Sequence, residues 1–270
     1  MNAGTWRGHD LGTRTTSYDE REAILYALAV GARADDLDLV FEERLRVLPT
    51  FALTRAQWAP DALGELGAFD TATAVHGSQK LRVLRPLPRS GELTMSAYVA
   101  EVWDKGSAAV FDVEVVSSHF VATWSLFAPG RGGFGGRRGP SAPRPQEQGP
   151  GHTLDLSTST EQAALYRLLG DRHHMHIDPE AAKEAGMPRP FLHGLCTLAS
   201  AVLPLADAAG EHPADLTELE GRFTAPAFPG DRLRIKAWEH GRGTGLRFEA
   251  GAPDGPVALS AGRAQFRVAT

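Results

Sequence analysis

The stretch 166–201, "YRLLGDRHHMHIDPEAAKEAGMPRPFLHGLCTLASA", joins a polar loop to an apolar segment. Asp178 has the side chain of a helix N-cap and Pro179 suits the first helical position, so we expect a short helix that ends at Gly186. The prolines of "MPRP" break this helix, and a longer apolar helix is expected to start near His193. Such a helix would close a core if one face of an antiparallel sheet packed over it.

Runs rich in β-branched and aromatic residues lie on both sides of this stretch and predict antiparallel strands. They span residues 80–87, 92–104, 107–118 and 120–127 before it, and 219–228, 231–240, 244–251 and 257–268 after it. A first helix is expected over 21–32, with Ser17 and Glu20 as a capping box. A short helix capped by Ser or Thr is expected over 157–170. The chain therefore reads as α+β, with two copies of a helix and an antiparallel sheet.

Residues 128–152 separate the two predicted units. This segment is rich in Gly, Pro and Arg and has almost no aliphatic side chain, so we expect a flexible linker. The first domain is then 1–127 and the second is 153–270. The linker sequence "GRGGFGGRRG" also has the composition of RNA-binding tails, but it lies between two folded halves of an acidic chain.

The composition limits the classes of function. The net charge of -5 argues against nucleic-acid binding, which needs a basic field. Apolar residues make up 42% of the 270 residues, enough for a substantial core. The single cysteine, Cys196, allows no intrachain disulfide, and we expect a cytoplasmic protein. Neither a signal peptide nor an apolar run of the ~20 residues that span a membrane is present, so no membrane location is expected.

The loop 170–179, "GDRHHMHIDP", holds three histidines and two aspartates. Asp171 and His176 would not share a face of a regular helix, but a bent loop can bring them together. A carboxylate and an imidazole that hold one water form a general acid–base pair. Two alternatives remain open from the residues alone. One is a solvated surface contact, and the other is a metal site that adds His173 and His174.

His193 and Gly194 form a second candidate feature. They lie at the start of the long apolar helix, where unpaired backbone N–H groups could hold a carbonyl oxygen that gains charge. A plain helix start is the alternative. Cys196 is expected to be a small core residue. Arg222 is either a charge at a strand edge or a contact to a phosphate or to the site, and Arg189 is a further candidate contact to coenzyme A or to the site.

The stretch 166–201 resembles the hydratase 2 motif of the MaoC-like family, which reads roughly Y-R-L-S-G-D-x-N-P-L-H-x-D-P followed by H-G-L-C-T. Further segments resemble the family in the same order, so the similarity extends over most of the chain. They are "LYALAVGA", "LPTFAL", "VHGSQKLRVLRPLPRSGEL", "DKGS", "GGFGG", "TEQAALYRLLGD" and "RFTAPAFPGDRL". The resemblance implies a double hot-dog fold, with an antiparallel sheet wrapped on a long helix in each half. The first half would accommodate the acyl tail and the second would carry the active site.

The same resemblance implies a (3R)-specific enoyl-thioester hydratase or dehydratase that adds water reversibly and syn to a trans-2-enoyl-CoA. Asp171 and His176 would activate the water, and the N–H of Gly194 would help to hold the thioester oxygen. No metal or organic cofactor is implied, and the partner is an acyl-thioester substrate. The alternatives are a dehydratase of a carrier-protein-bound 3-hydroxyacyl chain and a catalytically altered acyl-thioester-binding subunit. A homodimer is common in such families and is a candidate state.

The chain departs from the family pattern within the loop itself. His173 stands at the Asn position and His174 at the Pro position of the motif, while Ser78 stands where related eukaryotic enzymes have Glu. A charged His173 would depress the pKa of Asp171, and its bulkier ring could displace the water. His173, His174 and His193 are therefore candidate residues that tune the site.

Overall fold

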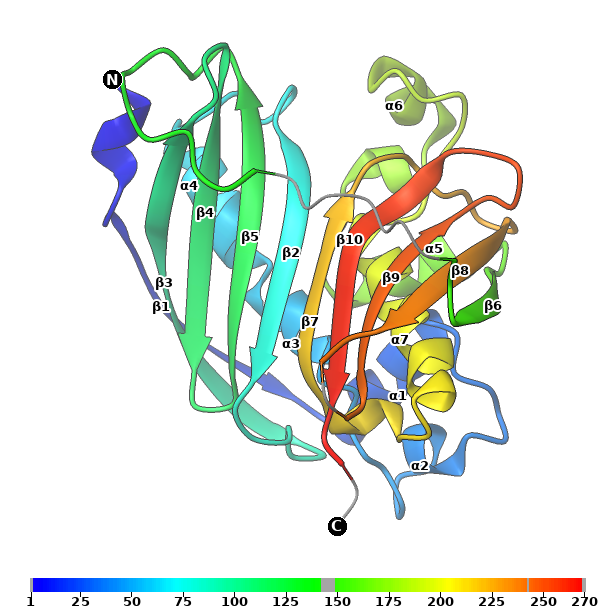
Figure 1. Ribbon diagram of the computed structural model, residues 1–270. Helices are drawn as coiled ribbons and strands as arrows, with labels where there is room; N and C mark the ends of the chain where they lie inside the picture. Colours follow the sequence, from blue (N-terminus) through cyan, green and yellow to red (C-terminus); the bar gives the residue numbers. More distant parts are fainter. Residues whose placement is uncertain (1, 142–148, 242, 269–270) are drawn as a thin grey trace.

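The strands form one antiparallel sheet in the computed structural model, which describes residues 2–141, 149–241 and 243–268 (Figure 1). Their order is β1-β3-β4-β5-β2-β7-β10-β9-β8-β6. The first five in the chain are β1 Asp10–Tyr18, β2 Val75–Val83, β3 Gly91–Asp104, β4 Ala108–Ser117 and β5 Phe120–Pro129. The others are β6 His152–Ser157, β7 Leu216–Phe223, β8 Arg232–Glu239, β9 Gly245–Gly251 and β10 Val257–Phe266.

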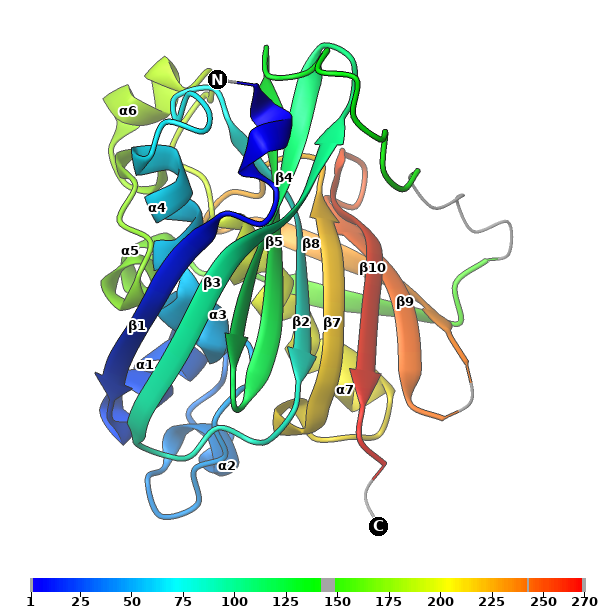
Figure 2. The ribbon, with the colours of Figure 1, turned by 90° about the vertical axis from the view of Figure 1, so that its left-hand side faces the viewer.

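The helices lie against one face of this sheet, as Figure 2 shows. They are α1 Glu20–Ala29, α2 Leu37–Val40, α3 Phe51–Ala56, α4 Trp58–Glu65, α5 Gln162–Tyr166, α6 Pro179–Glu184 and α7 Gly194–Ala208. Short 3-10 turns add η1 Ala3–Trp6, η2 Arg167–Leu169, η3 His174–His176 and η4 Pro213–Asp215. No helix in the described part of the chain is long and apolar enough to cross a membrane.

The two halves are joined by the pairing of β2 with β7. In this antiparallel ladder Ser78 lies opposite Arg222 and Lys80 lies opposite Glu220. The Lys80 ammonium and the Glu220 carboxylate form an ion pair of 3.4 Å across the junction. Because the ladder hydrogen bonds continue through the junction, the elements of one half are held in a fixed position against those of the other.

Helix α7 is the long apolar helix expected in the second half. Ten of its 15 residues are buried, because the helix contacts β6, β7 and β10 and also packs against α1 and α5 through Cys196 and Ser200. The helix crosses β7 very closely. A Cβ atom on Gly221 would lie 2.7 Å from Leu198 Cδ1, closer than side-chain carbon atoms approach one another. The absence of a side chain at Gly221 therefore sets the depth at which α7 sits on the sheet.

The first half packs two short helices on its sheet where a single long helix was expected. Helix α3 contacts β5, and α4 contacts β1 and β4. Both helices bury apolar side chains, among them Phe51 and Leu63. Gln57 separates α3 from α4, although its own backbone angles are helical. Apolar patterning predicted no helix over residues 51–65, and only the family resemblance implied a long helix in this half.

Two helix starts differ from the predicted ones. The capping box of α1 is formed by Asp19 and Glu22, not by Ser17 and Glu20, and the helix begins at Glu20. The N-cap of α5 is Glu161, which makes no side-chain cap hydrogen bond with the described residues. The predicted Ser or Thr cap of α5 is therefore wrong. Instead, the Gln162 side chain accepts a hydrogen bond from the Ser159 N–H at 3.2 Å.

Strand β1 was not predicted because its side chains are mostly exposed and polar. It pairs with β3, and hydroxyl groups face one another across the pair. Thr13 Oγ1 lies 2.9 Å from Ser96 Oγ, and Thr15 Oγ1 lies 2.9 Å from Thr94 Oγ1. The apolar alternation that identifies a half-buried strand is therefore missing at this edge of the sheet.

Much of the segment expected to be a flexible linker has a defined path. Residues 130–141 fold back over the β3–β4 hairpin, where the Asp104 carboxylate accepts hydrogen bonds from the N–H groups of Gly106, Gly133 and Gly135. These backbone hydrogen bonds, that of Gly133 first, lower the pKa of Asp104 to about 2. Residues 142–148 lie outside the described residues, and the domain limits at 127 and 153 stay a prediction.

We predict that Gly221→Ala destabilises the protein by about 1–3 kcal/mol, because the new methyl group forces Leu198 and α7 away from β7. Urea unfolding of the variant measures this loss. Gly149→Ala is the matched control, since a Cβ atom there meets nothing within 4 Å. Shortening the opposing side chain in Gly221→Ala/Leu198→Ala should cost less than the sum of the two single changes. Strict additivity would contradict the proposed steric contact.

Candidate active site

Asp171 lies in the loop between η2 and η3, where His173 donates two hydrogen bonds to its carboxylate. Oδ1 accepts hydrogen bonds from the backbone N–H of His173 at 3.0 Å and from the ring Nδ1 of His173 at 2.5 Å. Burial of Asp171 raises its pKa, but the His173 hydrogen bonds and the nearby ring of His193 outweigh it. The net result is a pKa well below the usual range of an aspartate, so the group is a carboxylate at neutral pH.

The loop that carries Asp171 is fixed by α3 of the first half. Arg55 Nη2 donates a hydrogen bond of 2.7 Å to the carbonyl oxygen of Leu169, two residues before Asp171. Gly170 packs directly on α3, where a Cβ atom would lie 3.1 Å from the Thr54 carbonyl oxygen. These contacts between distant parts of the chain have no local sequence signal. Sequence reasoning therefore missed Arg55.

His176 is presented by the 3-10 turn η3 and is 7% exposed. Its Nδ1 lies 2.8 Å from the carbonyl oxygen of Phe191. Because a carbonyl only accepts, Nδ1 carries the hydrogen and Nε2 keeps a lone pair. Burial lowers the pKa of His176, which favours the neutral ring. The structure thus offers a base, Nε2, on a ring of fixed orientation.

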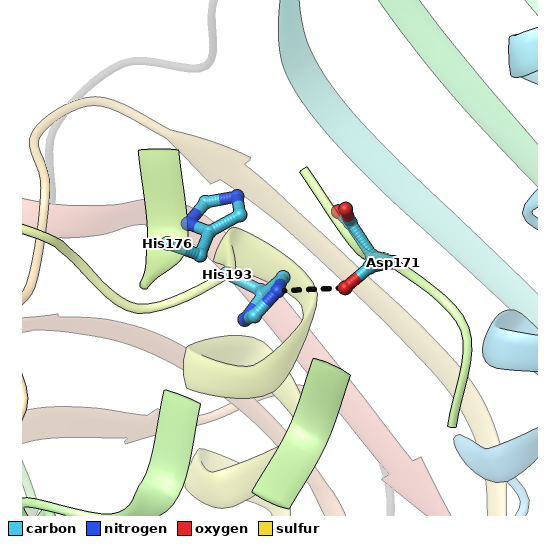
Figure 3. A group of neighbouring side chains, drawn as sticks. All are labelled: Asp171, His176 and His193. Atoms are coloured by element: carbon cyan, nitrogen blue, oxygen red, sulfur yellow. Dashed lines mark hydrogen bonds between the residues drawn. The ribbon is translucent and has the colours of Figure 1, made fainter. Parts of the chain in front are cut away.

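His193 supports both groups from the residue before α7. Its Nε2 donates a hydrogen bond of 3.1 Å to the backbone carbonyl of Asp171, as Figure 3 shows. Its ring centroid lies 3.8 Å from that of His176 and 4.9 Å from that of Tyr166. Burial, and then the neighbouring His176, lower the pKa of His193 to about 3. His193 is therefore a neutral spacer between the Asp171 loop and the His176 ring.

These three residues bring potential ligand atoms within 4.8 Å of one another (Figure 3). A water makes hydrogen bonds of about 2.8 Å, so one water can touch two atoms at this spacing. The same residue types also bind divalent transition metals. The predicted pairing of Asp171 with His176 is thus compatible with the geometry, and His193 joins them.

Gly194 begins α7 next to His193. The N-cap His193 makes no side-chain cap hydrogen bond with the described residues, and the first N–H groups of a helix lack intrahelical partners. A Cβ atom on Gly194 would lie 2.8 Å from the ring of Phe223. Glycine therefore lets the helix start approach β7, and it leaves the N–H beside the histidine pair without a shielding side chain.

The remaining candidates lie around or away from this centre. His174 is exposed and its carbonyl oxygen accepts from the N–H groups of Ile177 and Asp178. Arg189 forms an ion pair of 3.1 Å with Asp231. Its guanidinium also stacks on the Phe228 ring at 4.5 Å.

Arg222 is exposed on the outer face of β7, while its neighbour Phe223 packs inward on Gly194. The structure therefore does not bring Arg222 to Asp171 or His176. Cys196 is fully buried in α7, and burial raises the pKa of its thiol to about 12. It is a core residue, as expected.

Comparison with known proteins gives the family. The profile of the MFE-2 hydratase 2 N-terminal domain matches residues 16–126, and that of the MaoC like domain matches residues 141–251. 3-Hydroxyacyl-thioester dehydratase Y of Mycobacterium tuberculosis is 38% identical over 89% of this chain and 89% of that protein. The chain belongs to the MaoC-like hydratase 2 family. Peroxisomal multifunctional enzyme type 2 of Mus musculus is 39% identical over 87% of this chain, which spans 34% of that longer protein.

Solved structures confirm the double hot-dog fold. A MaoC-like dehydratase from Phytophthora capsici superposes with a TM-score of 0.88 at 27% identity, covering 99% of this chain and 98% of that one. A Mycobacterium tuberculosis protein described as a double hotdog fold superposes with a TM-score of 0.57 at 16% identity. It covers 96% of this chain and 94% of that one, and it bears on the fold alone.

We predict that the His193 ring stays neutral, as the Nε2–H tautomer, between about pH 5 and pH 8. Its folded-state pKa of about 3 lies below the ordinary value of 6.5. As the pH falls below 6.5, the unfolded chain binds a proton that the folded chain does not, so this group lowers the stability of the fold. Nitrogen chemical shifts of the assigned ring measure the tautomer and the charge. A titration of His193 inside that range would contradict the assignment.

Proposed function

We propose that the protein is a (3R)-specific enoyl-thioester hydratase/dehydratase that adds water to a trans-2-enoyl-CoA. One observation carries the proposal. The Asp171 carboxylate and the His176 ring offer atoms within 4.8 Å, beside the free helix start at Gly194. The family membership supports it, because the relatives include proteins named enoyl-CoA hydratase and 3-hydroxyacyl-thioester dehydratase. The two catalytic residues themselves are our assignment.

The protonation states suggest a role for each residue. Asp171 is ionised and His176 is neutral at neutral pH, so both can accept a hydrogen bond from one water. His176 Nε2 takes a proton from that water, and the resulting hydroxide oxygen bonds to carbon 3 of the enoyl group. The imidazolium then returns the proton to carbon 2, which leaves the ring neutral again. Asp171 accepts the second hydrogen of the water and stabilises the charged ring.

The start of α7 supplies the electrostatic part of this mechanism. Attack at carbon 3 moves negative charge onto the thioester oxygen, and a donor placed there lowers the barrier. The N–H of Gly194 and the positive end of the 15-residue helix are suited to this position. Since water and proton come from one side of the double bond, the addition is syn.

A second candidate function uses the same geometry in the reverse direction. The name of the Mycobacterium tuberculosis relative favours a dehydratase of 3-hydroxyacyl thioesters, including chains held on a carrier protein. An acyl-thioester-binding subunit without turnover is the non-catalytic alternative. The homodimer, the cytoplasmic location, the absence of a cofactor and an acyl-tail space in the first half stay predictions.

We predict that Asp171→Asn and His176→Gln each fold but lose about 10²- to 10⁴-fold of hydration activity, since each removes one half of the acid–base machinery. The decrease of conjugated-thioester absorbance with trans-2-enoyl-CoAs of several lengths measures turnover. Asp254→Asn and His9→Gln are matched controls, because both residues are exposed.

Two results would contradict the proposed hydratase function. One is wild-type protein that leaves the absorbance of every CoA and carrier-protein substrate unchanged. The other is an Asp171→Asn or His176→Gln variant as active as the controls. A chelator arm tests the metal alternative, because metal-dependent activity would be lost with chelator and regained on adding the ion.

A further inference from the structure

His173 binds the Asp171 carboxylate through two hydrogen-bond donors. Its backbone N–H and its ring Nδ1 both bind Oδ1 of the carboxylate, at 3.0 and 2.5 Å. Two donors on one oxygen restrict the rotation of the carboxylate. A hydrogen bond from a charged donor is roughly twice as strong as a neutral one. The charge of the His173 ring therefore determines the strength of its hydrogen bond to Asp171.

A second carboxylate, from the first half, acts on the same ring. Asp61 lies in α4, and its charge adds to that of Asp171 in raising the pKa of His173. The hydrogen bond with Asp171 is the largest cause of this rise, and burial opposes it. Asp61 is itself held by Gln57, whose Nε2 donates to Oδ1 at 3.2 Å. Burial raises the pKa of Asp61, while the His173 charge lowers it.

We propose that His173 is an imidazolium ion bound to Asp171, and that it positions the Asp171 carboxylate for the reaction. This inference rests on the proposed hydratase function. His173 is thus a positioning residue, since it acts through Asp171 and needs no contact with the substrate.

The other histidines and the tyrosine around this trio carry no positive charge near neutral pH. Burial lowers the pKa of His76, on which Asp171 acts, to about 4. Burial lowers the pKa of His176 and of His193, so both rings are neutral, and burial raises the pKa of Tyr166. Glu65 in α4 acts on Asp61 and raises its pKa. The remaining charged groups of the loop region are Arg167, which acts on His176, and the exposed Arg172.

The proposal gives the pH dependence a definite sign. His173 is charged below its ordinary pKa of 6.5 and loses its proton as the pH rises through a higher value. Its hydrogen bond to Asp171 then becomes a neutral one, and the positive charge near the developing enolate disappears. Activity should therefore fall on the alkaline side. An asparagine at this position has no proton to lose.

The test compares pH profiles of kcat/KM for wild type, His173→Asn, Asp61→Asn and the exposed-residue control Asp254→Asn. We expect an alkaline decrease of about 3- to 10-fold in wild type and in the control. The decrease should be absent in His173→Asn, and in Asp61→Asn it should begin at lower pH. A His173→Asn variant that keeps the wild-type alkaline decrease would overturn the proposal.

A second readout keeps the inference separate from the proposed function. The ring signals of His173, assigned by their loss in His173→Asn, are followed by NMR through a pH titration of wild type and Asp61→Asn. We expect a midpoint above 6.5 in wild type and a lower one in Asp61→Asn. A wild-type midpoint at or below 6.5 overturns the inference even if the enzyme is active. Absent turnover beside the expected titration overturns the function and leaves the charged trio intact.

Discussion

The pairing of β2 with β7 is the constraint on which the site depends. It makes one sheet of two halves, and so it fixes the helices of the first half beside the loop of the second. Arg55 can then reach the carbonyl of Leu169, and Thr54 can support Gly170. The loop residues 170–173 have little regular structure of their own. Their position is therefore set by tertiary contacts, and the free energy that orders them comes from the joined core.

Three titratable side chains of this site, Asp171, His176 and His193, are buried or half-buried but differ in charge. Burial alone would neutralise all three groups, because it disfavours every charged form. His176 and His193 follow this rule and become neutral. Asp171 does not, since His173 donates two hydrogen bonds to it. The site consequently combines an anionic acceptor with a neutral base at the same pH, a combination that holds a water without protonating either group.

The sequence predicted the elements whose signals are local. Helix α7, the Asp178–Pro179 start of α6 and eight of the strands follow from apolar patterning and capping, and the motif indicated Asp171, His176 and Gly194 as candidates. Strand β1 was not predicted, because its exposed threonines give no alternation of apolar and polar side chains. The defined path of residues 130–141 was not predicted, because composition cannot show that Asp104 binds the glycine N–H groups of this loop. Arg55 and Asp61 were not recognised as supports of the site, because only the fold brings them near residues more than 100 positions away in the sequence.

Helices of both halves contribute to the site. The long helix α7 of the second half begins at Gly194, next to His193. The first half contributes α3 and α4, two short helices separated only by Gln57, whose backbone angles are helical. Arg55 comes from α3 and Asp61 from α4, so neighbouring turns of one helical segment supply a hydrogen bond to the Asp171 loop and a negative charge that acts on His173. Because β2 pairs with β7, this segment of the first half is held in place beside the loop of the second half. The catalytic loop therefore depends on a helical segment that lies more than 100 positions away in the sequence.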